Sequence, residues 1–422
     1  MNKRIEIRKY NKITALLLFL LAAYIQLGRA VFRIDAPIDM GLILVFALIF
    51  VISAKTKAIG IPNLSFIMIL WGGLMFFSAI CIAPGIVGHH AKLLRVGYEA
   101  VCLLCMILFM VVSFNIASRN MEMMLLKFIA YLCLINASLS VVSEVTKFGP
   151  FMKMFYLSGA GIRFQGISEN PNDYMVQALV AFVYFYYSGK ERKSVRLLSV
   201  FVLIFSALAA GSKGGLFAIA VVLLAANYEK IIRRIKGWSQ KQIARCLLPV
   251  LILIVLLFVI VFGEQIAYIL SKFNVKGIER IVDLLRNPME GLNGSGSDRM
   301  ITWGGTIKVF HLSPLIGVGI GGHKQILTYL HFPFAYETPH SIYLELLEQC
   351  GIIGGAVIGF CVLRFIKNYV ALEETDKIVK GSFIILLLDG IFFASNWTAT
   401  FWIIVGIMLK RAGSSYYVVR LR

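Results

Sequence analysis

Apolar runs of about membrane-spanning length recur along the whole 422-residue chain, and this feature limits the possible folds more than any other. Of the residues, 59% are hydrophobic and only 15% are charged, and the mean hydropathy is +0.82. A soluble domain is nearer half apolar and a quarter charged. Because about 20 apolar residues cross a bilayer as one helix, the sequence predicts an all-α, polytopic membrane protein. No small-residue cleavage site closes the first run, so we interpret it as a helix and not as a signal peptide.

We predict twelve membrane-spanning helices, which places both termini on the same side of the membrane. They cover residues 13–30, 39–54, 64–83, 96–114, 124–143, 172–188, 195–210, 213–228, 247–263, 340–363, 378–394 and 396–409. The chain is thereby divided into residues 1–263 with nine helices, a long loop at 264–339, and residues 340–422 with three helices and a tail.

The basic residues are distributed unequally between the two predicted sides. The formal net charge is +20, and 27 of the 42 lysines and arginines fall on the side of the termini, against eight in the short loops of the other side. Such an excess in short loops marks the cytoplasm. We therefore expect cytoplasmic termini and an external loop at 264–339, and the charge gives no reason to predict nucleic-acid binding. In this loop we expect amphipathic helices at 277–285 and at 298–311, with Ser297 as the cap of the second.

Four polar motifs fall on the predicted outer side, and three of them contain a cation. Arg163 opens the motif 163–172, in which Asn170 caps a helix that begins at Pro171. Lys213 follows a tight glycine turn between two spans, and Arg299 begins a loop helix. Helix amino ends bind phosphates readily. Each cation alone is typical of an interfacial anchor, but three together predict an anion-selective outer cavity for a diphosphate.

The fourth motif places His340 at the amino end of an apolar helix. Nearby cations lower the pKa of such a histidine and keep its imidazole neutral, so that it can accept a proton as a general base. Tyr343 lies nearest along the helix, and Glu345 and Glu348 lie one to two turns deeper, where an acid is a functional candidate. A lone interfacial histidine is usually not catalytic, and the argument for His340 rests on the convergence of the four motifs.

Two other patterns predict no cofactor and no metal. The sequence 317–322 matches GxGxxG but follows Pro314 in an external loop without a preceding strand, so we expect a flexible turn there. Cys102 and Cys105 form a CxxC inside a span with no nearby histidine or acidic pair. We predict neither a metal site nor a disulfide at these cysteines.

Taken together, the motifs resemble those of the O-antigen polymerase and O-antigen ligase family of membrane glycosyltransferases. The resemblance covers about residues 160–360, in family order, and includes the glycine-rich sequence 313–319 and the helix start 339–354. Its motifs are RFQG with NPN at 163–172, GSKGG at 211–215, DR with Trp303, SPLIGVG at 313–319, and PHS with GIIG at 339–354.

The resemblance implies a GT-C-like fold and a metal-independent, inverting glycosyl transfer at the external face of the bacterial cytoplasmic membrane. It implies an undecaprenyl-diphosphate-linked oligosaccharide as donor and a glycan as acceptor. Arg163, Lys213 and Arg299 would hold the diphosphate and His340 would be the base, with Asn172, Tyr343 and Glu345 in support. The family has arginine where this chain has Lys213, which keeps the charge but loses the bidentate fork. It has asparagine where this chain has Ser341.

Three functions agree with these features. A polymerase of lipid-linked repeat units of O-antigen, capsule or exopolysaccharide is favoured, because many polysaccharide loci carry one; a chain-length regulator is then a candidate partner. A ligase that transfers the glycan to lipid A–core is the close alternative. A lipid-linked oligosaccharide transporter fits less well, because the long loop is external and late, and not cytoplasmic between two repeats.

Overall fold

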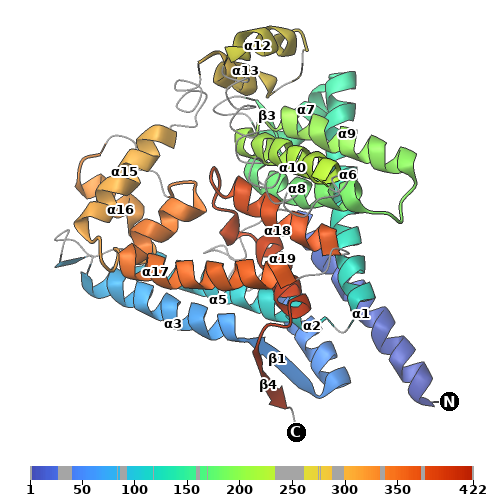
Figure 1. Cartoon of the computed structure of the whole chain (residues 1–422), viewed down its shortest axis with the longest axis vertical. Coiled ribbons are helices and arrows are strands. Elements are labelled where there is room, and N and C mark those ends of the chain that lie inside the picture. Colours follow the sequence, from blue (N-terminus) through green and yellow to red (C-terminus); the bar gives the residue numbers. More distant parts are fainter. Residues whose placement is uncertain are drawn as a thin grey trace.

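The computed structural model describes residues 2–26, 40–82, 84–85, 93–116, 118–157, 162–168, 170–232, 261–273, 275, 277–287, 299–332, 338–371 and 376–420. This part of the chain is mostly helical, with two short two-stranded sheets (Figure 1). Its elements are α1 (Asn2–Gln26), α2 (Met40–Thr56), β1 (Ala58–Pro62), α3 (Asn63–Phe77), η1 (Ser78–Ile82), α5 (Leu93–Phe114), α6 (Arg119–Thr146), α7 (Gly149–Phe155), β2 (Tyr156–Leu157), β3 (Arg163–Phe164), α8 (Pro171–Tyr187), α9 (Lys193–Ala209), α10 (Lys213–Ile232), α12 (Gly263–Ser271), α13 (Ile278–Arg286), α15 (Arg299–Leu312), α16 (His323–Tyr329), α17 (Ile342–Ala371), α18 (Lys377–Asp389), η3 (Ser395–Trp397), α19 (Ala399–Arg411) and β4 (Tyr416–Arg420).

Helix α8 lies at the centre of the bundle. It is apolar around most of its circumference, and its residues from Tyr174 to Phe185 are buried. A helix that is hydrophobic all round must be covered on all sides, and α6, α9 and α18 cover this one. Its first residue is Pro171, and the Asn170 side chain accepts a hydrogen bond from the amide of Asn172 at 2.8 Å. The predicted cap is confirmed, and it fixes where the central helix begins.

Most of the predicted spans agree with helices in the described residues. The span predicted at 378–394 is too long, because α18 ends at Asp389 and residues 390–394 form a turn, and α19 begins at Ala399 instead of 396. Among these residues, three helices are long and apolar enough to cross a membrane, at Asn63–Ile82, Leu93–Phe114 and Arg119–Thr146. Shorter apolar helices run over Asn11–Gln26, Ile43–Thr56 and Lys213–Tyr228. The ninth predicted span, 247–263, lies almost wholly outside the described residues. The protein is thus a helical membrane protein, whereas twelve spans and a GT-C-like arrangement stay predictions.

Helix α17 is interrupted, although the sequence predicted one continuous span from 340 to 363. At Gly351 the backbone is not helical, with φ 62° and ψ −166°. The loop before α16 lies in the interruption: the amide of Val318 donates to the carbonyl of Glu348 at 2.9 Å, and that of Ile352 donates to Pro314 at 2.7 Å. The interruption leaves backbone groups of α17 without helical partners, and this loop provides the partners.

The same contacts correct our expectation for the GxGxxG sequence. Gly317 to Ile320 are buried and hydrogen-bonded to α17 and to Met75, so the segment is packed and not a flexible turn. An added Cβ at Gly317 would come within 2.3 Å of the Gln349 backbone, and at Gly319 within 2.3 Å of the Met75 carbonyl. The glycines are therefore explained by the close approach of backbones and not by nucleotide binding.

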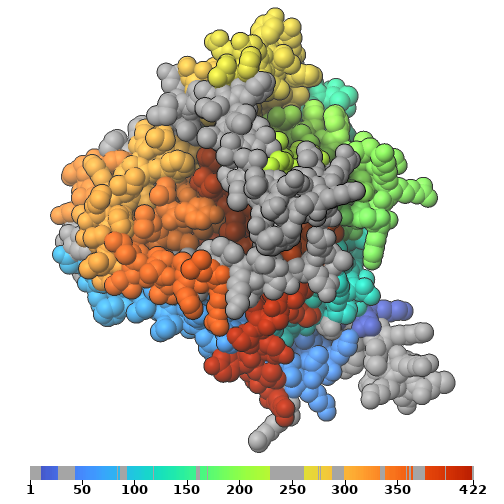
Figure 2. Space-filling model, in the orientation of Figure 1, coloured from blue at the N-terminus to red at the C-terminus, as the bar shows by residue number. Residues whose placement is uncertain are grey.

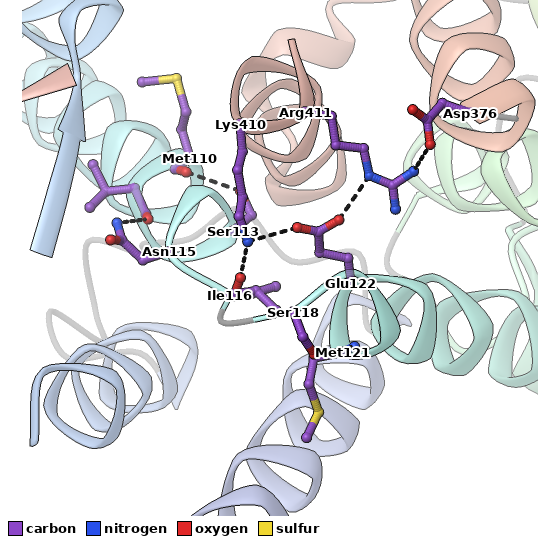
Figure 3. A network of polar contacts seen from close by, with 11 residues as sticks. Met110, Ser113, Asn115, Ile116, Ser118, Met121, Glu122, Asp376, Lys410 and Arg411 are labelled. Atoms are coloured by element: carbon purple, nitrogen blue, oxygen red, sulfur yellow. Dashed lines mark hydrogen bonds and ion pairs between the residues drawn. The ribbon is translucent and has the colours of Figure 1, made fainter. Parts of the chain in front are cut away.

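An ion network ties together three helix ends on one face (Figure 3). Arg411, at the end of α19, contacts Glu122 at 2.8 Å and also Asp376, which precedes α18. Lys410 contacts Glu122 at 2.8 Å, and Arg119 contacts Asp376 at 2.7 Å. Each buried carboxylate thus faces two cations, which compensates for its loss of hydration.

This face lies opposite to the one that carries the polar motifs. Asp376 precedes α18 and Asp389 ends it, so the length of one 13-residue helix, about 20 Å, separates the network from the opposite face. Strands β1 and β4 pair antiparallel beyond the network side, near the C-terminus (Figure 1). The α12–α13 pair, yellow in Figure 2, lies at the other end of the molecule.

Candidate functional site

A cavity opens where the amino ends of α8 and α10 meet the carboxyl end of α18 and two helices of the long loop, α13 and α15. Among the described residues its lining contains four cations and one carboxylate. The lining residues are Arg163, Asn172, Met175, Gly211, Ser212, Lys213, Gly214, Arg280, Arg299, Asp389, Phe392 and Phe393. The three cations predicted from the sequence come together here, and the strong excess of positive charge favours an anionic ligand.

Arg163 is held at the cavity by a small hairpin. Strands β2 and β3 pair antiparallel, and the fully buried Phe164 packs edge-on against Tyr174 of α8, with ring centroids 5.1 Å apart. The Arg163 guanidinium donates through Nε to the carbonyl of Ala210 at 2.8 Å and through Nη2 to Oδ1 of Asn172 at 2.9 Å. Burial and the neighbouring arginines lower the pKa of Arg163 to about 9, and the side chain stays cationic at neutral pH.

Lys213 is the first residue of α10 and is buried. The preceding turn is left-handed at Gly211, with φ 59°, and the Ser212 hydroxyl accepts a hydrogen bond from the amide of Gly215 at 3.3 Å. This cap starts α10 directly after the turn. Because a Cβ at Gly214 would lie 2.7 Å from the Cβ of Phe392, only glycine lets the end of α18 approach this closely.

Arg299 begins α15 and connects the long loop to the helix ends. Its Nη1 donates to the carbonyl of His340 at 3.2 Å and also to the carbonyl of Phe392. Asp389, buried at the end of α18, lines the same cavity. Burial lowers the pKa of Arg299 to about 10, while Asp389 raises it, and the guanidinium therefore keeps its charge. The helix expected at 298–311 is confirmed as Arg299–Leu312, whereas its expected cap Ser297 lies outside the described residues.

His340 lies beside the cavity but is not among its lining residues. It precedes α17, which begins at Ile342, and its backbone is left-handed with φ 52°, an uncommon conformation for a residue other than glycine. We had expected His340 on the first turn of this helix; the structure places it in the turn before the helix. Burial, and then the charge of Arg299, lowers the pKa of His340 to about 4, so its imidazole is neutral at neutral pH.

The three supporting residues take different places. Asn172 lines the cavity and holds Arg163. Tyr343 is half exposed and donates its hydroxyl to the carbonyl of Leu387 at 2.9 Å. Glu345 is buried and accepts hydrogen bonds from Trp397 at 2.7 Å and Gln349 at 3.2 Å. Neither Tyr343 nor Glu345 belongs to the described lining.

Two further polar features were not predicted from the sequence, namely Arg280 and the contact between His323 and Glu348. Arg280 lines the cavity from α13. The helical period places it about 200° from Ile278, on the polar side of the helix, where an arginine is normally solvated. Below the site, His323 of α16 contacts Glu348 of α17, with 2.5 Å between Nδ1 and Oε2, and both side chains are buried. Glu348 is a functional candidate from its position in the sequence, whereas His323 lies in a glycine-rich segment that gave no such signal.

Comparison with known proteins finds one family model that matches part of the chain. Residues 198–359 match the family model Wzy_C, described as O-Antigen ligase. The matched segment contains Lys213, Arg280, Arg299 and His340, whereas Arg163 precedes it. None of the curated proteins matches the chain. The match supports the predicted resemblance over residues 198–359, and this segment is similar to a family of glycosyltransferase-like enzymes that act on lipid-linked glycans.

Proposed function

We propose that the protein polymerises undecaprenyl-diphosphate-linked oligosaccharide repeat units at the outer face of the bacterial cytoplasmic membrane. The observation that carries the proposal is the convergence of Arg163, Lys213 and Arg299 on one cavity beside His340. A diphosphate fits this set because arginine forks pair with its oxygens and the lysine adds a point charge. The products would be O-antigen, capsule or exopolysaccharide chains.

The proposed reaction inverts the anomeric centre. The neutral imidazole of His340 accepts the proton of the acceptor hydroxyl. The acceptor oxygen then forms a bond to the anomeric carbon on the side opposite the diphosphate. The bond from that carbon to the diphosphate oxygen breaks, and its electron pair leaves with undecaprenyl diphosphate. The basic side chains stabilise the charge that develops on this oxygen, a role that a metal ion would otherwise have. We therefore propose a metal-independent reaction and expect a chelator to leave turnover unchanged.

The orientation in the membrane is part of the proposal. The excess of lysine and arginine in the loops on the side of the termini supports cytoplasmic termini. The cavity lies at the opposite ends of the helices from the ion network of Arg411, and it would then face outward.

The direct test uses the purified full chain in lipid nanodiscs with an undecaprenyl-diphosphate oligosaccharide. We expect release of undecaprenyl diphosphate and longer glycans. His340→Ala should lower turnover by roughly 10²–10⁴-fold, the usual effect of losing a general base. The exposed His311, on α15, provides the control variant His311→Ala. Full turnover by His340→Ala would show that this residue is not the base.

A ligase is the second candidate, because the matched family model is described as O-Antigen ligase. A deletion strain separates the two functions. Single repeat units on the final acceptor indicate that a polymerase is missing. Full-length chains that stay on undecaprenyl diphosphate indicate that a ligase is missing, and this result would overturn our choice. A transporter would instead leave the repeat units on the cytoplasmic side.

A further inference from the structure

One buried cation of the cavity comes from the long loop and not from the helices that surround the centre of the bundle. Arg280 lies on α13 and is only 7% exposed. The apolar side of α13 packs elsewhere: Ile278 and Val282 form a small core with Ala267 of α12 and Leu208 of α9. The fold thus uses both sides of this short helix, one for docking and the other to bring a charge into the cavity.

Two glycines make this docking possible. Gly277, directly before α13, has φ 88°, and a Cβ there would lie 2.2 Å from the carbonyl oxygen of Ala209. Gly211, in the turn before α10, would carry a Cβ 3.0 Å from the carbonyl oxygen of Gly277 and 3.1 Å from Cδ of Arg280. A side chain at Gly277 would therefore push α13 away from the turn that precedes Lys213.

Burial of an arginine is unfavourable unless its charge is compensated. Asp283 lies one turn further along α13 and its charge acts on Arg280, but Asp283 is exposed to solvent. The buried acid of the cavity lining is Asp389, which faces Arg299. In the described lining, four cations and one carboxylate give an excess of positive charge that favours a multiply charged anion.

We propose that Arg280 is a fourth residue that binds the diphosphate of the lipid-linked donor, and that the contact between Gly277 and Gly211 positions it. This inference rests on the proposed function. The long loop would then contribute two cations to the donor site, Arg299 from α15 and Arg280 from α13.

The first experiment measures donor kinetics of the purified full chain in nanodiscs. Arg280→Gln should raise the donor KM by roughly tenfold or more, the size expected for one charge-assisted hydrogen bond, whereas Arg280→Lys should recover part of the loss. Arg286→Gln is the matched control, because Arg286 is exposed on the same helix. Asp283→Asn separates two roles of Arg280, binding of the donor and a structural interaction with the charge of Asp283. An unchanged or lower donor KM supports donor binding, whereas a rise equal to that of Arg280→Gln would show that the effect of the Asp283 charge on Arg280 is what matters.

The second experiment tests the docking without changing any charge. Gly277→Ala should raise the donor KM in the same direction as Arg280→Gln. Gly413→Ala is the control, since Gly413 also has a positive φ, 62°, but no atom within 4 Å of an added Cβ. A normal donor KM for Gly277→Ala would overturn the positioning role.

Binding of inorganic diphosphate, measured by calorimetry, supplies a readout that does not depend on turnover. We expect Arg280→Gln to weaken it by roughly tenfold, like the donor KM. If the wild-type chain binds diphosphate but transfers no sugar, the proposed function fails and the assignment of Arg280 stands. If the wild-type chain transfers sugar and Arg280→Gln keeps both its donor KM and its diphosphate affinity, only the assignment of Arg280 fails.

Discussion

Asn172 offers the sharpest test of how the cavity is organised, because its side chain touches the Arg163 guanidinium directly. Oδ1 of Asn172 accepts from Nη2 of Arg163 at 2.9 Å. A hydrogen bond to a charged group contributes about 1.5–3 kcal/mol. Arg163 keeps its other bond, to the carbonyl of Ala210 at 2.8 Å, so we take the lower end of this range. Asn172→Ala should then lower the donor kcat/KM by roughly tenfold.

A double-mutant cycle decides whether Asn172 acts through Arg163. The four proteins are the wild type, Asn172→Ala, Arg163→Ala and the double variant, each assayed for transfer from the undecaprenyl-diphosphate donor. If the role of Asn172 is to hold Arg163, its substitution should cost almost nothing once Arg163 is absent, and the coupling should be about 1.5 kcal/mol.

Asn170→Ala is the matched control for the stability of α8. It removes the helix cap, worth about 1 kcal/mol, but keeps the bond between Asn172 and Arg163. We expect a lower melting temperature with a donor kcat/KM near that of the wild type. Equal losses for Asn172→Ala in the presence and absence of Arg163 would refute the positioning role.

Three further predictions follow from other contacts. Because only the neutral imidazole accepts a proton, activity should fall as the pH drops through the pKa of His340 near 4. Recovery of activity on return to neutral pH is the control for unfolding. A fall in activity already centred at about pH 6.5, the ordinary pKa of histidine, would contradict the burial of His340. Gly351→Ala should lower the free energy of unfolding by about 2 kcal/mol or more. Its Cβ would lie 2.5 Å from the Gly317 amide nitrogen, and its backbone conformation favours glycine. Gly355→Ala is the control and should melt like the wild type, because the space around Gly355 is open. Asp376→Asn should lower the free energy of unfolding by roughly 1–3 kcal/mol, because Arg119 and Arg411 lose a charged partner. Glu264→Gln, at an exposed position, is the control. Equal melting temperatures for the two variants would show that the network does not stabilise the fold.

Local sequence signals predicted the elements of this fold well. Asn170 and Pro171 marked the start of α8, and the apolar period over 277–285 gave α13, now seen at Ile278–Arg286. These signals depend on neighbouring residues and on the general properties of caps and amphipathic helices. The residues of the predicted cation set also had a local signal, since Lys213 and Arg299 each begin a helix and Arg163 belongs to the polar motif that precedes α8.

The features that were missed depend on contacts between distant segments. The interruption of α17 at Gly351 is stabilised by the carbonyls and amides of residues 314–319, which no local pattern connects to it. The position of Arg280 on the polar side of α13 suggested a solvated side chain, and only the packing of Gly277 on the α9–α10 turn brings it into the cavity. The left-handed turn at His340 likewise has a distant partner, because its carbonyl accepts a hydrogen bond from Arg299, which is 41 residues away along the chain.

The way in which the fold holds its arginines explains how the cavity stays positively charged. Arg163 donates to the carbonyl of Ala210 at the end of α9, and Arg299 donates to that of Phe392 just after α18. Carbonyls at helix carboxyl ends have no intrahelical partner and carry partial negative charge. They orient a guanidinium but leave its charge in place, whereas a carboxylate would neutralise it. Arg163 is thereby fixed in place while its charge remains available to a ligand, whereas Arg299 also faces the Asp389 carboxylate. Because the cations of the described lining outnumber this carboxylate, the cavity keeps the positive charge that a diphosphate-binding site requires.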